Sequence, residues 1–157
     1  MQLILLRHGK ADDHNPDGDF SRALTDKGRE QARRAARLLK SAGMLPDLVL
    51  TSPLVRTRQT AEEFCKTAEI PGAITQSWLS CGCTPKTLFT ELASYRDFKR
   101  VMIVGHEPDL SEIIETTIAA ADYTIQMKKG ALACLEIMPP AHRGSLLFLI
   151  PPKLADA

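Results

Sequence analysis

Three short, continuous runs of apolar residues most constrain the fold of this chain. They cover residues 3–6, 48–50 and 101–104, and each ends at a polar or glycine-containing break. Short apolar runs bounded in this way are typical of strands buried on both faces of a parallel sheet. The sequence therefore predicts a central, mostly parallel sheet covered by helices.

Helical patterns separate these runs, and capping residues predict where the first two helices begin. Thr25 is placed to cap a helix with a buried alanine- and leucine-rich face, and Gly43 is placed to end it. Ser52 is expected to cap a second helix that has Pro53 in its first turn and continues to about Ala68.

Two later helices are predicted from the same combination of capping residue and proline. Thr84 and Pro85 precede an apolar repeat that runs to Tyr95, and Pro108 is expected in the first turn of a helix that continues to Ile118. Residues 73–79 are interpreted as an edge strand.

The last third of the chain predicts an antiparallel element. Residues 131–138 and 145–150 are apolar or alternating and flank the turn at 139–144, which is typical of a β-hairpin. We therefore expect a single α/β domain over residues 1–157, a three-layer α/β/α sandwich with a central mostly parallel sheet and an antiparallel C-terminal hairpin.

Composition excludes several classes of protein. The net charge of +1 argues against a nucleic-acid or membrane-surface protein, so we expect neither partner. An opening apolar run of four residues is too short for a signal peptide or membrane span, which predicts a cytoplasmic protein. The four cysteines form no CxxC pair, so free thiols are expected and no metal site is predicted, with the role of Cys81 and Cys83 left open.

Basic residues follow all three apolar runs. Arg7 and His8 come directly after the first, Arg56 lies one turn into the helix after the second, and His106 follows the third. Because the carboxyl ends of parallel strands meet at one edge of a sheet, we expect these side chains to converge. An imidazole nucleophile among cations suits a phosphoryl group.

Further residues near this edge are weaker candidates for substrate binding. Residues 11–24 are polar and form a long loop, from which Arg22 is the residue expected to reach the substrate. Gly9 allows close approach of a ligand or of backbone. Glu107 is either a substrate contact or an acidic residue that stabilises the start of the following helix.

The motifs resemble those of the histidine phosphatase (phosphoglycerate-mutase-like) superfamily. The resemblance lies in residues 6–9, 24–32, 51–61 and 104–108, and the short chain with residues 105–111 is most similar to the small SixA-type phosphohistidine phosphatases. It implies that His8 is the nucleophile and forms a phosphohistidine, with Arg7, Arg56 and His106 around the phosphoryl oxygens. No metal or other cofactor is expected, because cations of the protein neutralise the developing charge.

The chain departs from the superfamily pattern at one point. Many larger members have a glutamate general acid after the third strand, but residues 78–83 contain no carboxylate. An alcohol leaves poorly unless it is protonated, whereas an imidazole, with a pKa of ~6.5, leaves readily as a neutral ring. This favours a phosphoramidate substrate, although Asp12, Asp19 or Glu107 remains an alternative acid.

These observations predict a metal-independent phosphohistidine phosphatase that hydrolyses a phosphoryl group from a histidine of a carrier or phosphotransfer protein. A small-molecule phosphomonoesterase of the same superfamily and a non-catalytic phosphate- or phosphoprotein-binding module are the alternatives. Lys128 and Lys129 either face an acidic protein partner or protect the edge of the sheet.

Overall fold

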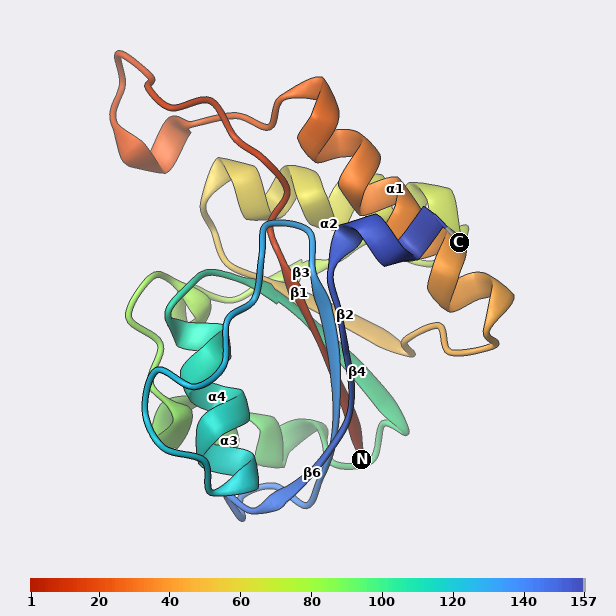
Figure 1. The fold of residues 1–157 in the computed structure, drawn as a ribbon, viewed down its shortest axis with the longest axis vertical. Helices are drawn as coiled ribbons and strands as arrows, with labels where there is room; N and C mark the ends of the chain where they lie inside the picture. Colours follow the sequence, from red (N-terminus) through yellow and green to blue (C-terminus); the bar gives the residue numbers. More distant parts are fainter. Residues whose placement is uncertain (157) are drawn as a thin grey trace.

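The computed structural model describes residues 1–156 and confirms the mixed sheet between two layers of helices (Figure 1). The six strands have the order β3-β2-β4-β1-β5-β6. The pairs β1–β4, β4–β2 and β2–β3 are parallel, whereas β5 is antiparallel to both β1 and β6. The strands are β1 (Gln2–Arg7), β2 (Leu48–Thr51), β3 (Ile74–Thr75), β4 (Arg100–Gly105), β5 (Leu132–Ile137) and β6 (Gly144–Ile150).

Helices α1 (Asp26–Ser41) and α2 (Val55–Ala68) cover one face of the sheet, and α3 (Pro85–Leu92) and α4 (Asp109–Ile118) cover the other (Figure 1). Four short 3-10 helices complete the described part: η1 (Asp19–Ser21), η2 (Ser77–Leu79), η3 (Ala93–Tyr95) and η4 (Pro152–Asp156). No helix within residues 1–156 has the length and apolar character that crossing a membrane requires.

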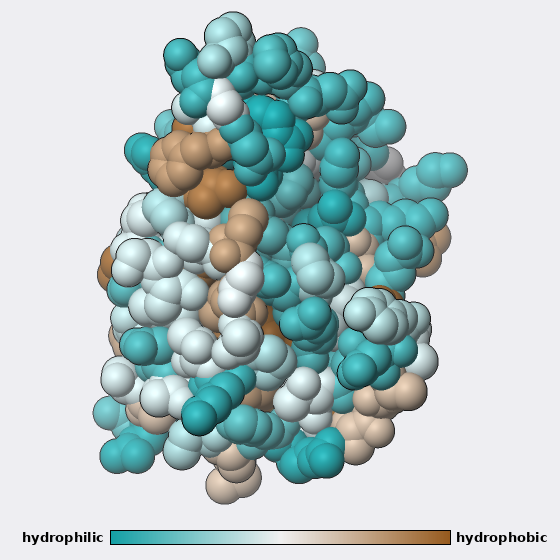
Figure 2. Space-filling model, turned by 90° about the vertical axis from the view of Figure 1, so that its left-hand side faces the viewer, coloured by the Kyte–Doolittle hydropathy of each residue, from teal (hydrophilic) through white to brown (hydrophobic). Residues whose placement is uncertain are grey.

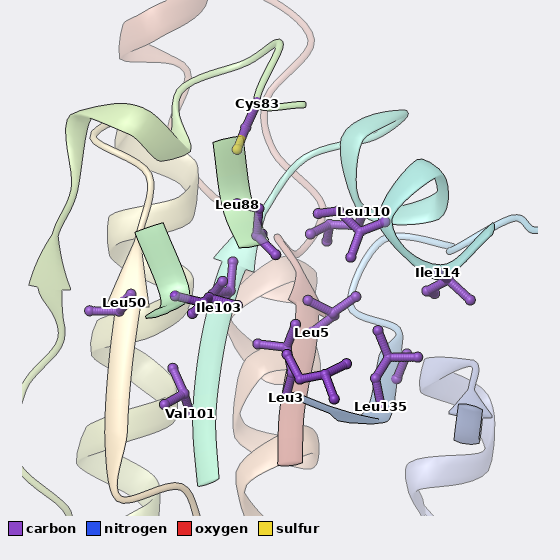
Figure 3. Packing of buried hydrophobic residues seen from close by; sticks show 14 of the residues in the cluster. Leu3, Leu5, Leu50, Cys83, Leu88, Val101, Ile103, Leu110, Ile114 and Leu135 are labelled. Carbon is purple, nitrogen blue, oxygen red and sulfur yellow. The ribbon is translucent and has the colours of Figure 1, made fainter. Parts of the chain in front are cut away.

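The buried residues of β1 explain why the sheet has helices on both faces. Leu3 and Leu5 pack with residues of α3 and α4 (Figure 3), and Ile4 and Leu6 pack with residues of α1 and α2. Successive side chains of a strand point to opposite faces, so an unbroken apolar run must be covered twice. The run that predicted a central strand therefore also accounts for the two helical layers.

Most of the predicted helix ends are confirmed. The Thr25 side chain accepts a hydrogen bond from the Gly28 amide, and the Thr84 side chain accepts one from the Thr87 amide. Gly43 follows α1 with a φ of 66°, a left-handed conformation that glycine adopts at low energetic cost.

Several predicted details were wrong. Helix α2 begins at Val55, beyond Pro53, and its N-cap residue is Leu54 rather than Ser52. The Ser52 hydroxyl lies 2.7 Å from His106 Nε2 and accepts a hydrogen bond from the Leu54 amide at 3.4 Å. Pro108 precedes α4 as its N-cap residue. The strand expected over residues 73–79 is only Ile74–Thr75, because the chain turns into η2 directly afterwards.

The prediction that Lys128 and Lys129 protect an edge of the sheet was also wrong. Lys128 and Lys129 precede β5, and β5 lies between β1 and β6 inside the sheet. These two lysines therefore protect no edge, and their position has to be explained differently.

A close approach of two glycines fixes the loop after β1 against the start of α1. A Cβ atom added to Gly28 would lie 2.1 Å from the Lys10 carbonyl oxygen, and one added to Gly9 would lie 2.3 Å from the Gly28 carbonyl oxygen. Both obstacles are backbone atoms, so neither can move aside as a flexible side chain would. The contact places the residues after His8 directly on α1.

We expect Gly28→Ala to lower the free energy of unfolding by about 1–3 kcal/mol, because the new methyl group overlaps backbone. Gly72→Ala is the matched control: nothing lies within 4 Å of its added Cβ, and its stability is expected to change by less than about 0.5 kcal/mol. Urea denaturation of both variants measures the difference. Equal stability of the two variants would show that the glycine contact does not constrain the loop.

Candidate active site

The ends of β1, β2 and β4 bring the predicted residues together at one edge of the sheet. Backbone hydrogen bonds continue past the strands, from the His8 amide to the Gly105 carbonyl and from the Ser52 amide to the Val104 carbonyl, both at 3.2 Å. The rings of His8 and His106 have centroids 5.6 Å apart. Arg7 and Arg56 lie close enough to both imidazoles to influence their ionisation.

His8 is held as a neutral imidazole with one defined tautomer. Its side chain is 5% exposed, and burial, helped by the nearby arginines, lowers its pKa to about 3. Its Nδ1 lies 2.8 Å from the Gly9 carbonyl oxygen, which can only accept a hydrogen bond, so Nδ1 carries the proton. The lone pair of the neutral ring is therefore on Nε2, where a nucleophile requires it.

His106 is also buried and neutral. It is 3% exposed, and burial together with Arg56 lowers its pKa to about 4. Its Nε2 lies 2.7 Å from Ser52 Oγ. Its Nδ1 is buried and has no hydrogen-bond partner among residues 1–156.

The two arginines present further donors without partners. Arg7 donates from one terminal nitrogen to the Met127 carbonyl at 2.7 Å, and burial lowers its pKa. The Nε atoms of Arg7 and Arg56 are buried and have no partner among the described residues. Buried donors are normally satisfied, and exceptions are typical of functional sites. Together with His106 Nδ1 these atoms suit the oxygens of a bound phosphoryl group.

Asp19 is a residue of this site whose pairing the sequence did not predict. Its backbone oxygen and carboxylate accept hydrogen bonds from Arg56 at 3.0 and 3.2 Å. A hydrogen bond from Arg22 at 2.9 Å, together with the charge of Arg56, lowers the Asp19 pKa. The backbone oxygen and the carboxylate of Asp19 thus occupy one terminal nitrogen of Arg56 each.

The weaker candidates are placed as follows. Arg22 binds Asp19 and the Asp12 carbonyl, so it is linked to Arg56 through Asp19 rather than directly. The Glu107 carboxylate accepts hydrogen bonds from the amide and hydroxyl of Ser111, in the first turn of α4.

Gly9 serves a close backbone contact, and its amide donates to Thr60 Oγ1 at 3.1 Å. In the described structure this glycine is therefore engaged with protein atoms on both sides. Direct binding of substrate by Gly9, Arg22 and Glu107 remains a prediction.

The segment with the two close cysteines also reaches the site. Cys81 Sγ lies 3.9 Å from a terminal nitrogen of Arg56. The Asp109 carboxylate accepts hydrogen bonds from the amides of Gly82 and Cys83 at 2.8 and 3.1 Å and thereby fixes this segment. Asp109 follows His106 by three residues and lies within the 105–111 segment on which the resemblance rests, but its contact with residues 82 and 83 was not predicted.

The surface around the loop of residues 11–24 is mainly polar. Figure 2 shows hydrophilic side chains over most of the upper part of this face, and apolar residues form only small, separate patches. Within residues 1–156 no group of three or more His, Cys, Asp or Glu side chains is arranged to hold a metal ion.

A family model for the histidine phosphatase superfamily (branch 1) matches residues 3–79. An uncharacterised protein of Picosynechococcus sp. strain PCC 7002 is 33% identical over 96% of this chain and 95% of its own length. The chain therefore belongs to the histidine phosphatase superfamily, which includes phosphatases and mutases, and an enzyme acting on phosphoryl groups is supported. Phosphoglycerate mutase 2 of Saccharomyces cerevisiae is 40% identical, over 42% of this chain but 24% of the mutase.

Solved structures with the same fold include several phosphatases. The protein histidine phosphatase SixA bound to tungstate has a TM-score of 0.88 at 22% identity and covers 98% of this chain and 99% of its own. An Agrobacterium tumefaciens protein assigned as a phosphohistidine phosphatase SixA has a TM-score of 0.82 at 26% identity, covering 96% and 97%. The α-ribazole phosphatase of Shigella flexneri has a TM-score of 0.76 at 21% identity, covering 97% of both chains.

The two buried imidazoles predict how stability depends on pH. Their folded-state pKa values, about 3 and about 4, lie below the ordinary 6.5, so in acid the unfolded chain binds more protons. The contribution of the two neutral imidazoles to folding stability is complete above pH 6.5 and is lost as the pH falls toward their folded-state pKa values. Between about pH 7 and pH 5, wild type is expected to lose about 2 kcal/mol more stability than His8→Asn, which removes one titrating ring.

Urea denaturation at a series of pH values measures this difference. His14→Asn, on the exposed part of the 11–24 loop, is the control for the loss of an imidazole elsewhere. Parallel loss of stability in wild type and His8→Asn would contradict a buried, neutral His8.

Proposed function

We propose that this protein is a phosphohistidine phosphatase, which removes a phosphoryl group from a histidine of another protein through a phosphorylated His8. The orientation of His8 supports the first step, because its Nε2 carries the free lone pair and its Nδ1 proton is held by the Gly9 carbonyl. The unpartnered nitrogens of Arg7, Arg56 and His106 support binding of the phosphoryl oxygens.

The proposed reaction has two displacements. In the first, His8 Nε2 forms a bond to phosphorus, the bond from phosphorus to the substrate imidazole breaks, and that ring leaves neutral when its other nitrogen carries a proton. In the second, water attacks phosphorus and the bond to His8 Nε2 breaks, which releases inorganic phosphate and restores neutral His8. The proton on His8 Nδ1 stays in place throughout.

The choice of substrate rests on how the carboxylates nearest the site are engaged. Burial raises the pKa of Asp109, but its carboxylate accepts hydrogen bonds from the Gly82 and Cys83 amides, which favour the ionised form. Asp19 is ion-paired with two arginines, which lower its pKa and keep it ionised. Glu107 is engaged by Ser111, and the segment beside Arg56 presents Cys81. A leaving group that departs without an acid, such as imidazole, fits this site better than an alkoxide does.

We further propose that the reaction is metal-independent and that the protein acts in the cytoplasm on a phosphorylated carrier or phosphotransfer protein. Guanidinium groups supply the positive charge that a metal ion supplies in other phosphoryl-transfer enzymes.

A small-molecule phosphomonoesterase is the second candidate. The fold is shared with an α-ribazole phosphatase, and Asp19 is near enough to Arg56 to face the leaving group if the loop of residues 11–24 moves. Asp19 would then have to gain a proton after losing its arginine partners.

The covalent step predicts an acid-labile label on wild-type protein incubated with phosphate-labelled phosphoramidate. His8→Ala is expected to carry no label and to lose at least about 10³-fold in turnover, since only the nucleophile is removed. His14→Ala is the matched control and is expected to resemble wild type. Label on the His8→Ala protein would exclude His8 as the nucleophile.

The missing acid predicts a steep dependence of rate on the leaving group. Phosphohistidine, phosphoramidate and nitrophenyl phosphate are expected to react, whereas glycerol phosphate and sugar phosphates are expected to be nearly inert. The measurement is kcat/KM for aryl and alkyl phosphates of graded leaving-group pKa at one pH. A general acid would make the series shallow, because protonation in the transition state levels the leaving groups. A shallow series that becomes steep in Asp19→Asn would establish the phosphomonoesterase instead.

A further inference from the structure

A groove of about 670 Å³ adjoins the active site and is lined by positive charge. It lies between the start of α1, the turn before β5 and residues 151–154, three segments that Figure 1 shows near one another. We call it the basic groove. Seven of the described residues that line it are Lys or Arg, and none is Asp or Glu. A concentration of like charge is notable in a chain whose net charge is only +1.

The lysines of the basic groove have no ion-pair partner among the described side chains. Within residues 1–156 none of the five has an ion-pair partner; they are Lys10, Lys27, Lys128, Lys129 and Lys153. The arginines of α1 differ from these lysines. Arg29 and Arg33 pair with Glu63, and Glu30 pairs with Arg37 and with the groove residue Arg34. Unpaired like charges repel one another, so an anionic partner would stabilise this arrangement.

The basic groove is built by contacts distant in sequence and leads to the catalytic residues. Lys27, Gln31 and Arg34 follow a helical spacing that places them on one side of α1. The Lys10 amide donates to Gln31 Oε1 at 2.8 Å, which holds the end of the β1 loop on this side of the helix. Arg7 lines the groove and also belongs to the proposed phosphate site, so the two are contiguous.

We propose that the basic groove docks an acidic segment of the phosphorylated protein substrate, next to its phosphohistidine. This inference rests on the proposed function and adds the surface by which the substrate is recognised. Flexible lysine ammonium groups are point charges that suit carboxylates spread along a surface, whereas a shaped phosphate subsite favours the forked donors of arginine.

The remaining wall of the groove also favours a polypeptide. It is formed by Pro151, Pro152 and Leu154, which offer apolar contact to the stems of side chains. No aromatic ring among the described lining residues is available to stack on a base, so single-stranded RNA is a poorer occupant.

The first experiment compares two triple variants. Lys27→Glu/Lys128→Glu/Lys153→Glu reverses charge in the basic groove, and Lys66→Glu/Lys86→Glu/Lys99→Glu makes the same change at exposed lysines outside it. The substrates are phosphoramidate and a phosphorylated histidine carrier protein with acidic residues around its histidine. Charge complementarity acts mainly on association, so the groove variant is expected to lose about tenfold or more in kcat/KM on the carrier.

Phosphoramidate hydrolysis is expected to be unchanged in both variants, and the outside variant is expected to resemble wild type on the carrier. The wild-type advantage on the carrier is also expected to shrink as salt is raised. An equal loss in the two variants, or no loss in the groove variant, would overturn the docking proposal.

The second experiment does not depend on catalysis. Fluorescence anisotropy measures binding of a labelled peptide of alternating glutamate and serine, and of a labelled RNA oligonucleotide, to wild type and both variants. Binding of the peptide that is lost only in the groove variant supports the proposal even if the carrier is not dephosphorylated, a result that would reject the proposed function alone. Tighter binding of RNA than of peptide would overturn the docking proposal. Peptide binding that survives charge reversal in the groove variant would also overturn it.

Discussion

The site depends on the parallel, in-register pairing of β1 and β2 with the strand β4 between them. Leu6 and Thr51 both pair with Val104, so the three loops that carry the functional residues leave the sheet at the same level. The hydrogen bonds from the His8 and Ser52 amides to β4 continue the parallel pairing by one residue beyond β1 and β2, into the loops. A slip of one residue would turn His8 to the other face of the sheet, so register and function are inseparable here.

This arrangement collects positive charge and leaves it incompletely balanced. Arg56 is only 4% exposed, and the two imidazoles are kept neutral by the same burial. In the described structure Asp19 supplies a negative charge to Arg56, while the Nε atom of that arginine stays without a partner. The ion pair between Asp19 and Arg56 thus balances this positive charge only in part.

The sequence predicted the fold and the convergence of Arg7, His8, Arg56 and His106 because both follow from local signals. Apolar runs mark buried strands, and parallel strands must end at one edge. The hydrogen-bond partners of individual side chains could not be predicted from local signals, because they are often distant in the sequence. Ser52 was interpreted as a helix cap, and its hydroxyl instead binds His106, 54 residues away. The basic groove escaped detection for a similar reason, since its lysines come from three segments that only the folded chain brings together.

The proposed function assigns chemistry and recognition to different surfaces of this protein. A phosphohistidine phosphatase that works without a general acid would select by leaving group alone, and every phosphohistidine releases an imidazole. Under that proposal, discrimination among phosphorylated proteins would arise outside the place where the bond breaks. The imidazoles of His8 and His106 are buried, so the side chain of a protein substrate would have to extend into the site while its surrounding surface rests on the rim. The basic groove lies on that rim and shares Arg7 with the site, which makes it the natural surface for this selection.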